Sequence, residues 1–498
     1  MKLKAKSLNI STGGIKVILL HGRDAVSLGL NEGDRVQIKP KNIIAVINTT
    51  EKYDYVKKGE VGIFNEIQEF GIKSGSKIEL IPARKPESIS YILKKLKGKR
   101  LKDEEIFRII KDIVDGKLTD IEMTYFVSAC YMNELNFKET VALTKAMIDT
   151  GDKLKFGKNK IIADKHCIGG VAGNRTTAFV VPIVASAGIT IPKTSSRSIT
   201  SPAGTADTME VLCNVALDVN KIKRIINKIG ACMVWGGSLS LAPSDDKIIK
   251  VEHPVSLDPS GQLLASILSK KKSVGATHCL IDIPLGKGAK IEKRKEAIEL
   301  KNQFEKLSKE IDLKLKVVIT DGSEPIGNGI GPALEARDLL WILKNDPRGP
   351  KKLLEKGIDL AGELLELTGK AKKNEGRKIA RKIVETGKAH KKFMEILKAQ
   401  GQYVENPEQI KIARLKIDIK SSKEGKITHI DNKIISKIAK LAGAPSDKSA
   451  GIYMYLHKKD IVEKNEPLFT IYASTKSSLD IAKKYASKKL SECYKIKN

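Results

Sequence analysis

Cysteine and aromatic residues are scarce in this sequence, and both shortages narrow the range of functions. The six cysteines are scattered over 498 residues, and none forms a CxxC pair. A disulfide framework and a structural zinc site are therefore not expected. Aromatic residues make up 5% of the chain, and no dense basic run is interleaved with them. This argues against a surface that binds nucleic acid.

Long apolar runs are also missing. No segment approaches the roughly 20 residues that span a bilayer, and the N-terminus, MKLKAKSLNISTGG, lacks the apolar segment of a signal peptide. We therefore expect a cytoplasmic protein that does not bind membranes. Hydrophobic residues form 41% of the chain, which is enough for ordinary cores. The length predicts about two to four domains.

Acidic residues are outnumbered by basic ones, 59 to 90, which gives a formal net charge of +31. Nucleic-acid binding is one explanation of such a charge. The lysines are spread along the whole chain and mixed with glutamate, however, and this favours a basic solvated surface. A positive field of this kind would attract phosphorylated small molecules.

A pattern of glycine and apolar residues occurs twice near the N-terminus, at 28–38 (LGLNEGDRVQI) and at 70–80 (FGIKSGSKIEL). In each copy a glycine turn, at Gly33 or Gly75, precedes alternating strand residues. The two copies predict a pseudo-symmetric β-barrel over residues 1–84, similar to double-psi barrels. The repeat carries no titratable cluster, which indicates a structural or assembly role.

After Pro86 the apolar spacing becomes helical, and from 160 to 345 strands, glycine-rich loops and helices alternate. Four apolar stretches, at 161–163, 189–191, 231–235 and 317–320, are each followed by such a loop. This order is typical of a mostly parallel α/β sheet whose loops gather at one edge, where ligands bind. From about 410 short strands and turns return, which predicts a separate C-terminal α+β domain.

The first of these loops has the composition of a phosphate site. It reads Asp164-Lys-His-Cys-Ile-Gly-Gly-Val-Ala-Gly173. Glycines let backbone N–H groups approach an anion, and a helix expected from about Arg175 adds its positive end. Lys165 would add a mobile positive charge. The alternative is an ordinary turn between a strand and a helix.

The second loop, residues 193–207, is rich in hydroxyl groups between Thr194 and Ser201 and again at Thr205. Hydroxyls and amides bind phosphate oxygens without a permanent charge. We expect Asp207 to cap the following helix, with Glu210 three residues later completing a capping box. Asp207 is therefore interpreted as structural.

A third stretch combines a carboxylate with a polar helix face. Asp258 precedes Pro259, the usual order of a helix N-cap and its first residue. The alternative is a general acid, and the pattern by itself favours the cap. Ser266 and Lys270 lie four residues apart, on one face of the expected helix.

Together these segments resemble the thymidine and pyrimidine-nucleoside phosphorylase family over residues 88–498. The matching motifs are DKHCIGGVAG, SSRSITSPAGTADTMEVL, ASILSKKK and AGIYMYLHKKDIVEKNEPL. The additional N-terminal barrel is similar to the archaeal branch of AMP phosphorylases. The resemblance implies a multidomain α/β protein with four parts: a double-psi-like β-barrel at 1–84, a helical domain at 85–158 and 252–275, a mostly parallel α/β phosphate-binding domain at 159–251 and 276–405, and a C-terminal α+β domain at 406–498.

The resemblance implies a glycosyltransferase of the pentosyltransferase class, which carries out reversible phosphorolysis of AMP to adenine and ribose 1,5-bisphosphate. Cleavage of CMP and UMP is left open. Phosphate is then a co-substrate, no cofactor or metal ion is expected, and a homodimer or larger homo-oligomer is implied. The chain departs from the family pattern twice: Val251-Glu252 replaces an Arg-Asp pair that contacts pyrimidines, and Cys167 replaces a serine of the phosphate loop.

The resemblance also assigns roles to individual residues. It makes Asp258 the acid that protonates the leaving base. The implied substrate-binding residues are Gly170, Ser196, Arg197, Ser198, Ile199, Thr200, Ser201, Thr205, Ser266 and Lys290. The residues implied for phosphate binding are Lys165, His166, Gly169 and Lys270.

Three other functions are alternatives. The nearest is a nucleoside phosphorylase acting on uridine or thymidine, against which Val251 argues. A transferase like anthranilate phosphoribosyltransferase would need an acidic magnesium site, for which Asp245-Asp246 is a candidate. A nucleic-acid-binding protein would show tight, salt-dependent binding.

Overall fold

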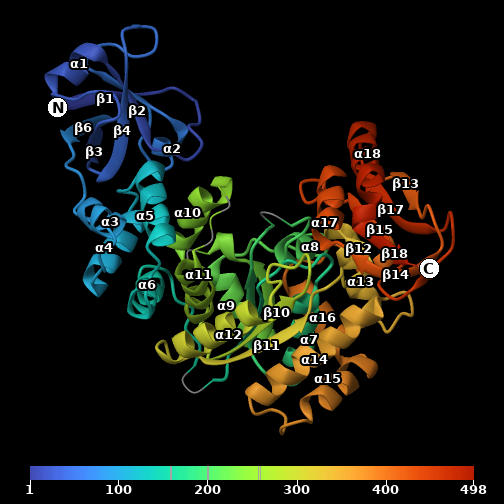
Figure 1. Cartoon of the computed structure of the whole chain (residues 1–498). Coiled ribbons are helices and arrows are strands. Elements are labelled where there is room, and N and C mark those ends of the chain that lie inside the picture. The colour runs from blue at the N-terminus through green and yellow to red at the C-terminus, as the bar shows by residue number, and fades with distance from the viewer. Residues whose placement is uncertain (158–159, 199–200, 240, 256, 258, 498) are drawn as a thin grey trace. The chain divides into compact units, whose positions relative to one another are not determined.

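The computed structural model describes residues 1–157, 160–198, 201–239, 241–255, 257 and 259–497 (Figure 1). The chain divides into two compact units, Met1–Ala146 with Ser244–Gln262 and Met147–Pro243 with Leu263–Asn498. The four domains expected from the sequence are a finer division than these units, and their boundaries stay a prediction.

The N-terminal segment forms a closed six-stranded barrel, drawn in blue in Figure 1. Its elements are β1 (Lys2–Ser7), β2 (Val17–His21), α1 (Gly22–Ser27), β3 (Arg35–Lys39), β4 (Ile43–Thr50), β5 (Glu60–Ile63), α2 (Asn65–Gln68) and β6 (Lys77–Pro82). Alternate residues of the strands point inward and form one apolar core, which includes Leu3, Ile18 and Ile38. The barrel predicted from the sequence repeat is therefore confirmed.

The strand pairing of the barrel shows the same internal repeat. β1 runs parallel to β5, and its counterpart β4 runs parallel to β2. β1 is antiparallel to β6, and β4 is antiparallel to β3. Each half is thus a strand–strand–helix–strand unit, and the repeated segments at 28–38 and 70–80 lead into the equivalent strands β3 and β6.

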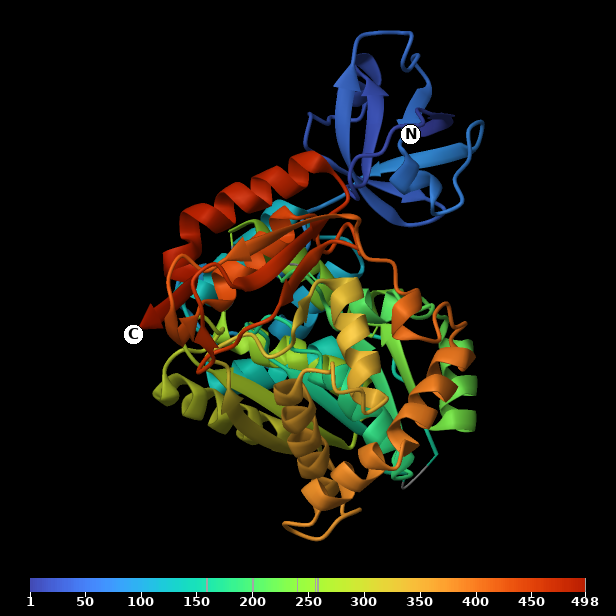
Figure 2. The same ribbon diagram turned by 90° about the vertical axis from the view of Figure 1, so that its right-hand side faces the viewer.

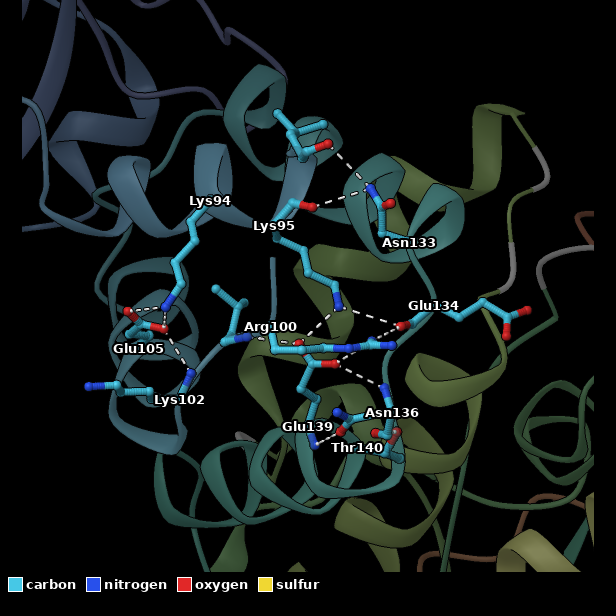
Figure 3. Close-up of polar contacts among 12 residues, drawn as sticks. Lys94, Lys95, Arg100, Lys102, Glu105, Asn133, Glu134, Asn136, Glu139 and Thr140 are labelled. Atoms are coloured by element: carbon cyan, nitrogen blue, oxygen red, sulfur yellow. Dashed lines mark hydrogen bonds and ion pairs between the residues drawn. The ribbon is translucent and has the colours of Figure 1, made fainter. Parts of the chain in front are cut away.

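The helical part of the first unit is organised around a buried ion pair (Figure 3). It contains α3 (Ser88–Leu96), α4 (Asp103–Val114), α5 (Asp120–Met132) and the start of α6 (Phe137–Asp149), together with α10 (Pro243–Glu252) and η2 (His253–Val255). The carboxylate of Glu139 accepts hydrogen bonds from Lys95 Nζ at 2.9 Å, Arg100 Nη1 at 3.0 Å and Leu101 N at 2.9 Å. Both Lys95 and Glu139 are buried, so one carboxylate ties α3 to α6.

The second unit contains parallel strands, as the strand–loop–helix order predicts. β7 (Ala163–Cys167), β10 (His278–Leu285) and β11 (Lys314–Asp321) form a sheet in the order β11-β10-β7, and β8 (Ile191–Ser195) pairs in parallel with β9 (Ala231–Trp235). A parallel bridge between Ile162 and Thr190 links the two groups. The central strand β10 was not among the stretches predicted from the sequence.

Helices bury the faces of this sheet. α7 (Thr176–Ser186) is apolar on all sides and almost fully buried, as expected of a core helix. It packs against α14 (Lys351–Leu367) and α16 (Lys388–Ala399). The other helices are α8 (Thr205–Glu210), α9 (Val219–Ile229), η1 (Gly236–Ser238), α11 (Ser260–Ser273), α12 (Arg294–Lys309), α13 (Pro332–Leu343), α15 (Gly376–Glu385) and η3 (Pro407–Gln409).

The C-terminal part of the second unit has two antiparallel sheets and two helices. The first sheet has the order β12-β15-β17-β13, from Gly329–Ile330, Gly451–Met454, Pro467–Ala473 and Leu415–Lys420. The second has the order β16-β14-β18, from Ile461–Val462, Gly425–Ile430 and Tyr494–Lys497. Figure 2 shows the long helix α18 (Lys476–Cys493) along the first sheet, and α17 (Asn432–Leu441) packs against α18.

Among the described residues, the helices are all too short or too polar to cross a lipid bilayer.

Candidate active site

The carboxyl ends of β7 and β10 lie at the same edge of the sheet, because the two strands are parallel. The loops after these strands, together with the loop after β8, line a cavity of about 310 Å³. Three substrate-binding residues implied by the family resemblance line this cavity, namely Gly170, Ser201 and Lys290. Residues that are distant in sequence are thus brought together at the edge where parallel sheets bind ligands.

The glycine loop after β7 has a backbone that requires glycine. Gly169 and Gly170 have φ angles of +91° and +90°, which side chains of L-residues rarely permit. A Cβ atom on Gly170 would lie 2.1 Å from the backbone nitrogen of Lys290. The loop after β7 and the loop after β10 therefore touch backbone to backbone at one wall of the cavity.

Lys165 lies on the strand that precedes this loop and does not line the cavity. It belongs to strand β7 and is fully buried, with Nζ donating to Thr176 Oγ1 at 2.9 Å and to Thr177 Oγ1 at 3.1 Å. Asp282 Oδ2 on β10 is 3.8 Å from the same nitrogen. Burial lowers the pKa of Lys165. The expectation of a mobile charge on the loop is therefore wrong: the ammonium group is fixed by the helix that follows the loop.

His166 and Cys167 are the last residues of β7, and both are half-buried. Burial, followed by the charges of nearby lysines that include Lys271 and Lys270, lowers the pKa of His166 well below its usual value. Burial raises the pKa of the Cys167 thiol to about 11, so the side chain is a neutral thiol near pH 7. Asn174 Nδ2 contacts its sulfur at 3.5 Å.

A buried cluster of charges fixes the strand before the serine-rich loop. Asp164 Oδ1 accepts a hydrogen bond from Lys193 Nζ on β8 at 3.1 Å, and Asp164 Oδ2 lies 2.9 Å from Lys271 Nζ on α11. All three side chains are almost completely buried. The cluster connects β7, β8 and α11, and so fixes the strands that lead into the glycine loop and the serine-rich loop.

The serine-rich loop is held by Asp207, but not in the way expected. Asp207 is the third residue of α8, and the N-cap is Gly204. Asp207 Oδ2 accepts from Gly204 N and from Ser198 N, both at 2.7 Å. Ser198 Oγ and Ser201 Oγ are 2.9 Å apart. The structural role expected of Asp207 is thus present, although the capping box is shifted by three residues and does not use Glu210.

Glu210 instead forms an ion pair with Arg197. Its Oε1 accepts from Arg197 Nη2 at 2.6 Å, and the guanidinium group of Arg197 lies 4.1 Å from the centre of the Trp235 ring. Ser196, next to Arg197, is exposed. Ile199 and Thr200 lie outside the residues that the structure describes.

The remaining predicted residues lie on three elements. Thr205 is the first residue of α8, and its Oγ1 accepts from Arg175 Nη1 at 3.2 Å. Ser266 and Lys270 are on α11, half-buried and four residues apart as predicted, and Lys290 is exposed at the cavity. Asp258 lies outside the described residues, so its role stays a prediction.

The structure brings further residues to the cavity that the sequence analysis did not assign to the site, among them Arg175, Glu335 and Asn432. Arg175 and Glu335 form an ion pair that is almost fully buried, and burial raises the pKa of the Glu335 carboxyl. Asn432 begins α17 and is buried beside the glycine loop. Arg175 could have been found as the first charged residue after the glycine loop, whereas no local pattern marks Glu335 or Asn432.

Among the described residues, no three His, Cys, Asp or Glu side chains lie close enough together to hold a metal ion. Asp245, proposed for the magnesium site of a transferase, is buried in the first turn of α10. The absence of a metal requirement stays a prediction.

Known protein families match three parts of the chain. The helical bundle domain of a glycosyl transferase family matches residues 89–151, and the a/b domain of the same family matches residues 159–390. The C-terminal domain of pyrimidine nucleoside phosphorylases matches residues 426–497. The order of these parts is the order predicted from the motifs.

A relative from Pyrococcus furiosus, named AMP phosphorylase, is 47% identical over 492 residues, which cover 97% of this chain and 95% of the relative. The chain belongs to the family of thymidine and AMP phosphorylases. Further archaeal members carry the same name. A member from Legionella pneumophila is 42% identical over 487 residues, covering 96% of this chain and 93% of its own, and has the provisional name of a thymidine phosphorylase.

A solved structure shares the fold of part of this chain. Anthranilate phosphoribosyltransferase from Thermus thermophilus superposes with a TM-score of 0.51 at 17% identity, over 62% of this chain and 98% of its own. Helix α17, which lines the cavity, lies in the part of the chain that matches the C-terminal domain of pyrimidine nucleoside phosphorylases.

Proposed function

We propose that this protein is an AMP phosphorylase, which transfers the ribose 5-phosphate group of AMP from adenine to inorganic phosphate. The observation that carries the proposal is the cavity at the sheet edge, where Gly170, Ser201 and Lys290 meet several cationic side chains. Its wall is made of glycine-loop amides, hydroxyl groups and lysines, the groups that bind phosphate oxygens. The near full-length similarity to chains named AMP phosphorylase supports the choice of nucleotide.

The reaction needs a nucleophile, a leaving group and one proton. A phosphate oxygen forms a bond to C1′ of the ribose while the bond from C1′ to N9 of adenine breaks, and the bonding electrons stay on the base. Positive charge develops on the sugar, and the phosphate anion beside it stabilises that charge. Adenine leaves as a neutral molecule when N7 receives a proton, and the second product is ribose 1,5-bisphosphate.

We assign the proton to Asp258 as general acid. The assignment rests on the family resemblance, which implies an acid at this position, and helix capping and acid catalysis are compatible. A carboxyl group can hold a proton near pH 7 only when burial or neighbouring negative charge raises its pKa. The phosphate groups of both substrates would supply that charge.

The attacking phosphate is assigned to the glycine loop. The amides of Gly169 and Gly170, with Thr205 and the nearby serine hydroxyls, would bind its oxygens. Lys165 would hold the start of α7 in place beneath the phosphate site and would not bind phosphate directly, since its ammonium group donates to Thr176 and Thr177. Ser266 would position the nucleotide, and His166 and Lys270 would contact the attacking phosphate, with a neutral His166 offering one N–H donor.

The proposal includes four further expectations, on cofactors, assembly, barrel type and domain boundaries. No metal ion or cofactor takes part, because phosphate itself is the second substrate. The protein forms a homodimer or a larger homo-oligomer in the cytoplasm, where its nucleotide substrates are found. The N-terminal barrel is of the double-psi type and serves assembly. The α/β, helical and C-terminal domains have the boundaries expected from the sequence.

The first experiment follows adenine release from AMP, with and without inorganic phosphate and with EDTA present, and uses adenosine, uridine and thymidine as competing substrates. Release that depends on phosphate, persists in EDTA and is confined to the nucleotide is the expected result. Preference for uridine or thymidine would show that the protein is a nucleoside phosphorylase. A requirement for magnesium and pyrophosphate would move it to the transferases.

The acid is tested with Asp258→Asn, which should lower the rate of adenine release by about 100-fold or more and leave AMP binding intact. Asp480→Asn, at an exposed residue of α18, is the matched control and should turn over AMP at the wild-type rate. Near wild-type turnover in Asp258→Asn would show that another group protonates the base.

A further inference from the structure

One wall of the cavity comes from the C-terminal domain. Five residues of α17 line it, namely Asn432, Lys433, Ser436, Lys437 and Lys440. Their spacing of one, three and four residues places them on one side of the helix. This helix was not connected to the site by any of the sequence motifs.

The helix is anchored to the glycine loop and not merely near it. Asn432 is 1% exposed; its Oδ1 accepts from Ala172 N at 3.1 Å, and its Nδ2 donates to the carbonyl of Gly322 at 3.0 Å. Asp431 caps the helix by accepting from the backbone N–H groups of Lys433 and Ile434, each at 2.9 Å. The lysines one and two turns further on therefore start from a fixed point beside the glycine loop.

The charges around the cavity do not balance. Arg175 is paired with Glu335, and Lys433 is paired with Glu292 at 3.1 Å. Among the residues that the structure describes, Lys437 and Lys440 are exposed and have neither an ion pair nor a hydrogen bond from their side chains. The wall formed by α17 thus presents uncompensated positive charge next to the hydroxyl group of Ser436.

We infer that Lys437, Lys440 and Ser436 bind the 5′-phosphate of the nucleotide substrate, and that α17 is therefore the element that distinguishes a nucleotide from a nucleoside. The inference rests on the proposed function and names the residues that recognise the phosphate monoester. Lys290 lines the same cavity and would add a further positive charge. Lysine and hydroxyl donors around a dianion are the usual means of recognising such a group.

The exposure of Lys437 and Lys440 indicates which of the two phosphate groups in the reaction they bind. The attacking phosphate must reach C1′ at a distance of roughly 3–3.5 Å in a site that excludes water. The 5′-phosphate does not react and tolerates a solvated rim. Lys437 and Lys440 are exposed, so they suit the second group, while the glycine loop suits the first.

The test compares Lys437→Gln/Lys440→Gln with a control, Lys483→Gln/Lys484→Gln, which removes the same charge from exposed positions on α18. The KM for AMP and the KM for inorganic phosphate are measured for each, and the binding of ribose 5-phosphate is measured by calorimetry. We expect the KM for AMP and the Kd for ribose 5-phosphate to rise by about tenfold or more in the α17 variant. The KM for phosphate should stay at the wild-type value, and the control should match the wild type in all three.

The outcomes separate the inference from the proposed function. A rise in the KM for phosphate with an unchanged KM for AMP would place the nucleophile at α17, and unchanged constants would show that the lysines are solvated surface. Either result overturns the inference. If the wild type does not cleave AMP, the proposed function fails, and calorimetry still decides about the site: weaker binding of ribose 5-phosphate in the α17 variant alone supports it, and no binding by the wild type refutes it.

Discussion

Gly170→Ala is the most direct test of how the glycine loop is built. The added methyl group meets two separate obstacles. The φ angle of +90° disfavours any L-residue, and the new Cβ would lie 2.1 Å from the backbone nitrogen of Lys290. Gly169→Ala meets only the first, because φ is +91° and no atom lies within 4 Å of its Cβ. The pair of variants therefore separates backbone strain from the clash.

The sizes of the two effects follow from general principles. An alanine held in the left-handed region costs about 1–2 kcal/mol, and this applies to both variants. The clash at Gly170 adds about 1–3 kcal/mol, as overpacking usually does. The Lys290 backbone must move by about 1 Å to restore an ordinary contact distance. A shift of that size at a substrate-binding loop can lower turnover by about 100-fold.

Thermal unfolding and steady-state kinetics of the two variants provide the assay. Gly169→Ala should lower the melting temperature by a few degrees, and Gly170→Ala by more, at about 2–4 °C per kcal/mol. Only Gly170→Ala should lose most of the phosphorolysis of AMP. Equal effects of the two substitutions on stability and on turnover would refute the backbone contact between the two loops.

Two further predictions concern stability. Glu139→Gln leaves the ammonium group of Lys95 buried without its counter-charge, so the free energy of unfolding should fall by about 3–5 kcal/mol in urea titrations. The control Glu104→Gln, at an exposed position on α4, should change the free energy of unfolding by less than about 0.5 kcal/mol. Similar losses in both variants would contradict the role of the ion pair. Burial raises the pKa of Asp338 from 3.8 to about 7, so between these pH values the folded protein holds a proton that the unfolded chain has released. Stability should therefore fall as pH rises through this window, by up to about 1.4 kcal/mol per pH unit from this group. Asp338→Asn should remove that part of the slope in unfolding curves measured from pH 4 to 7, and superimposable slopes for variant and wild type would show that Asp338 titrates normally.

The barrel was predictable because its signal is local. The two copies of the glycine pattern lead into β3 and β6, and the period of two along the strands marks the inward side chains. The parallel strands of the second unit were only partly predictable. β10 lies between β7 and β11, buried on both faces, so its side chains do not alternate, and the stretch was passed over.

The place of Lys165 was mispredicted for a related reason. The glycines after it are typical of a loop, and the lysine was counted with them. Its actual place on β7 depends on pairing with β10 through Lys165 and Leu280, and a single sequence does not reveal that pairing. Because Lys165 lies on the strand and not in the loop, its charge is buried and not mobile.

The sequence by itself determined the family, the repeat of the barrel, and the residue types that face the cavity, because motifs of glycine, hydroxyl and lysine residues are read within short segments. Only the tertiary structure decided which of these residues meet. Asn432 contacts Ala172 across 260 residues of chain, and Arg175 pairs with Glu335 with no shared motif. Such contacts depend on the packing of whole domains, since a buried polar group is satisfied by whichever partner the fold brings within reach. For this reason the phosphate loop was visible in the sequence, while the helix that completes its cavity was not.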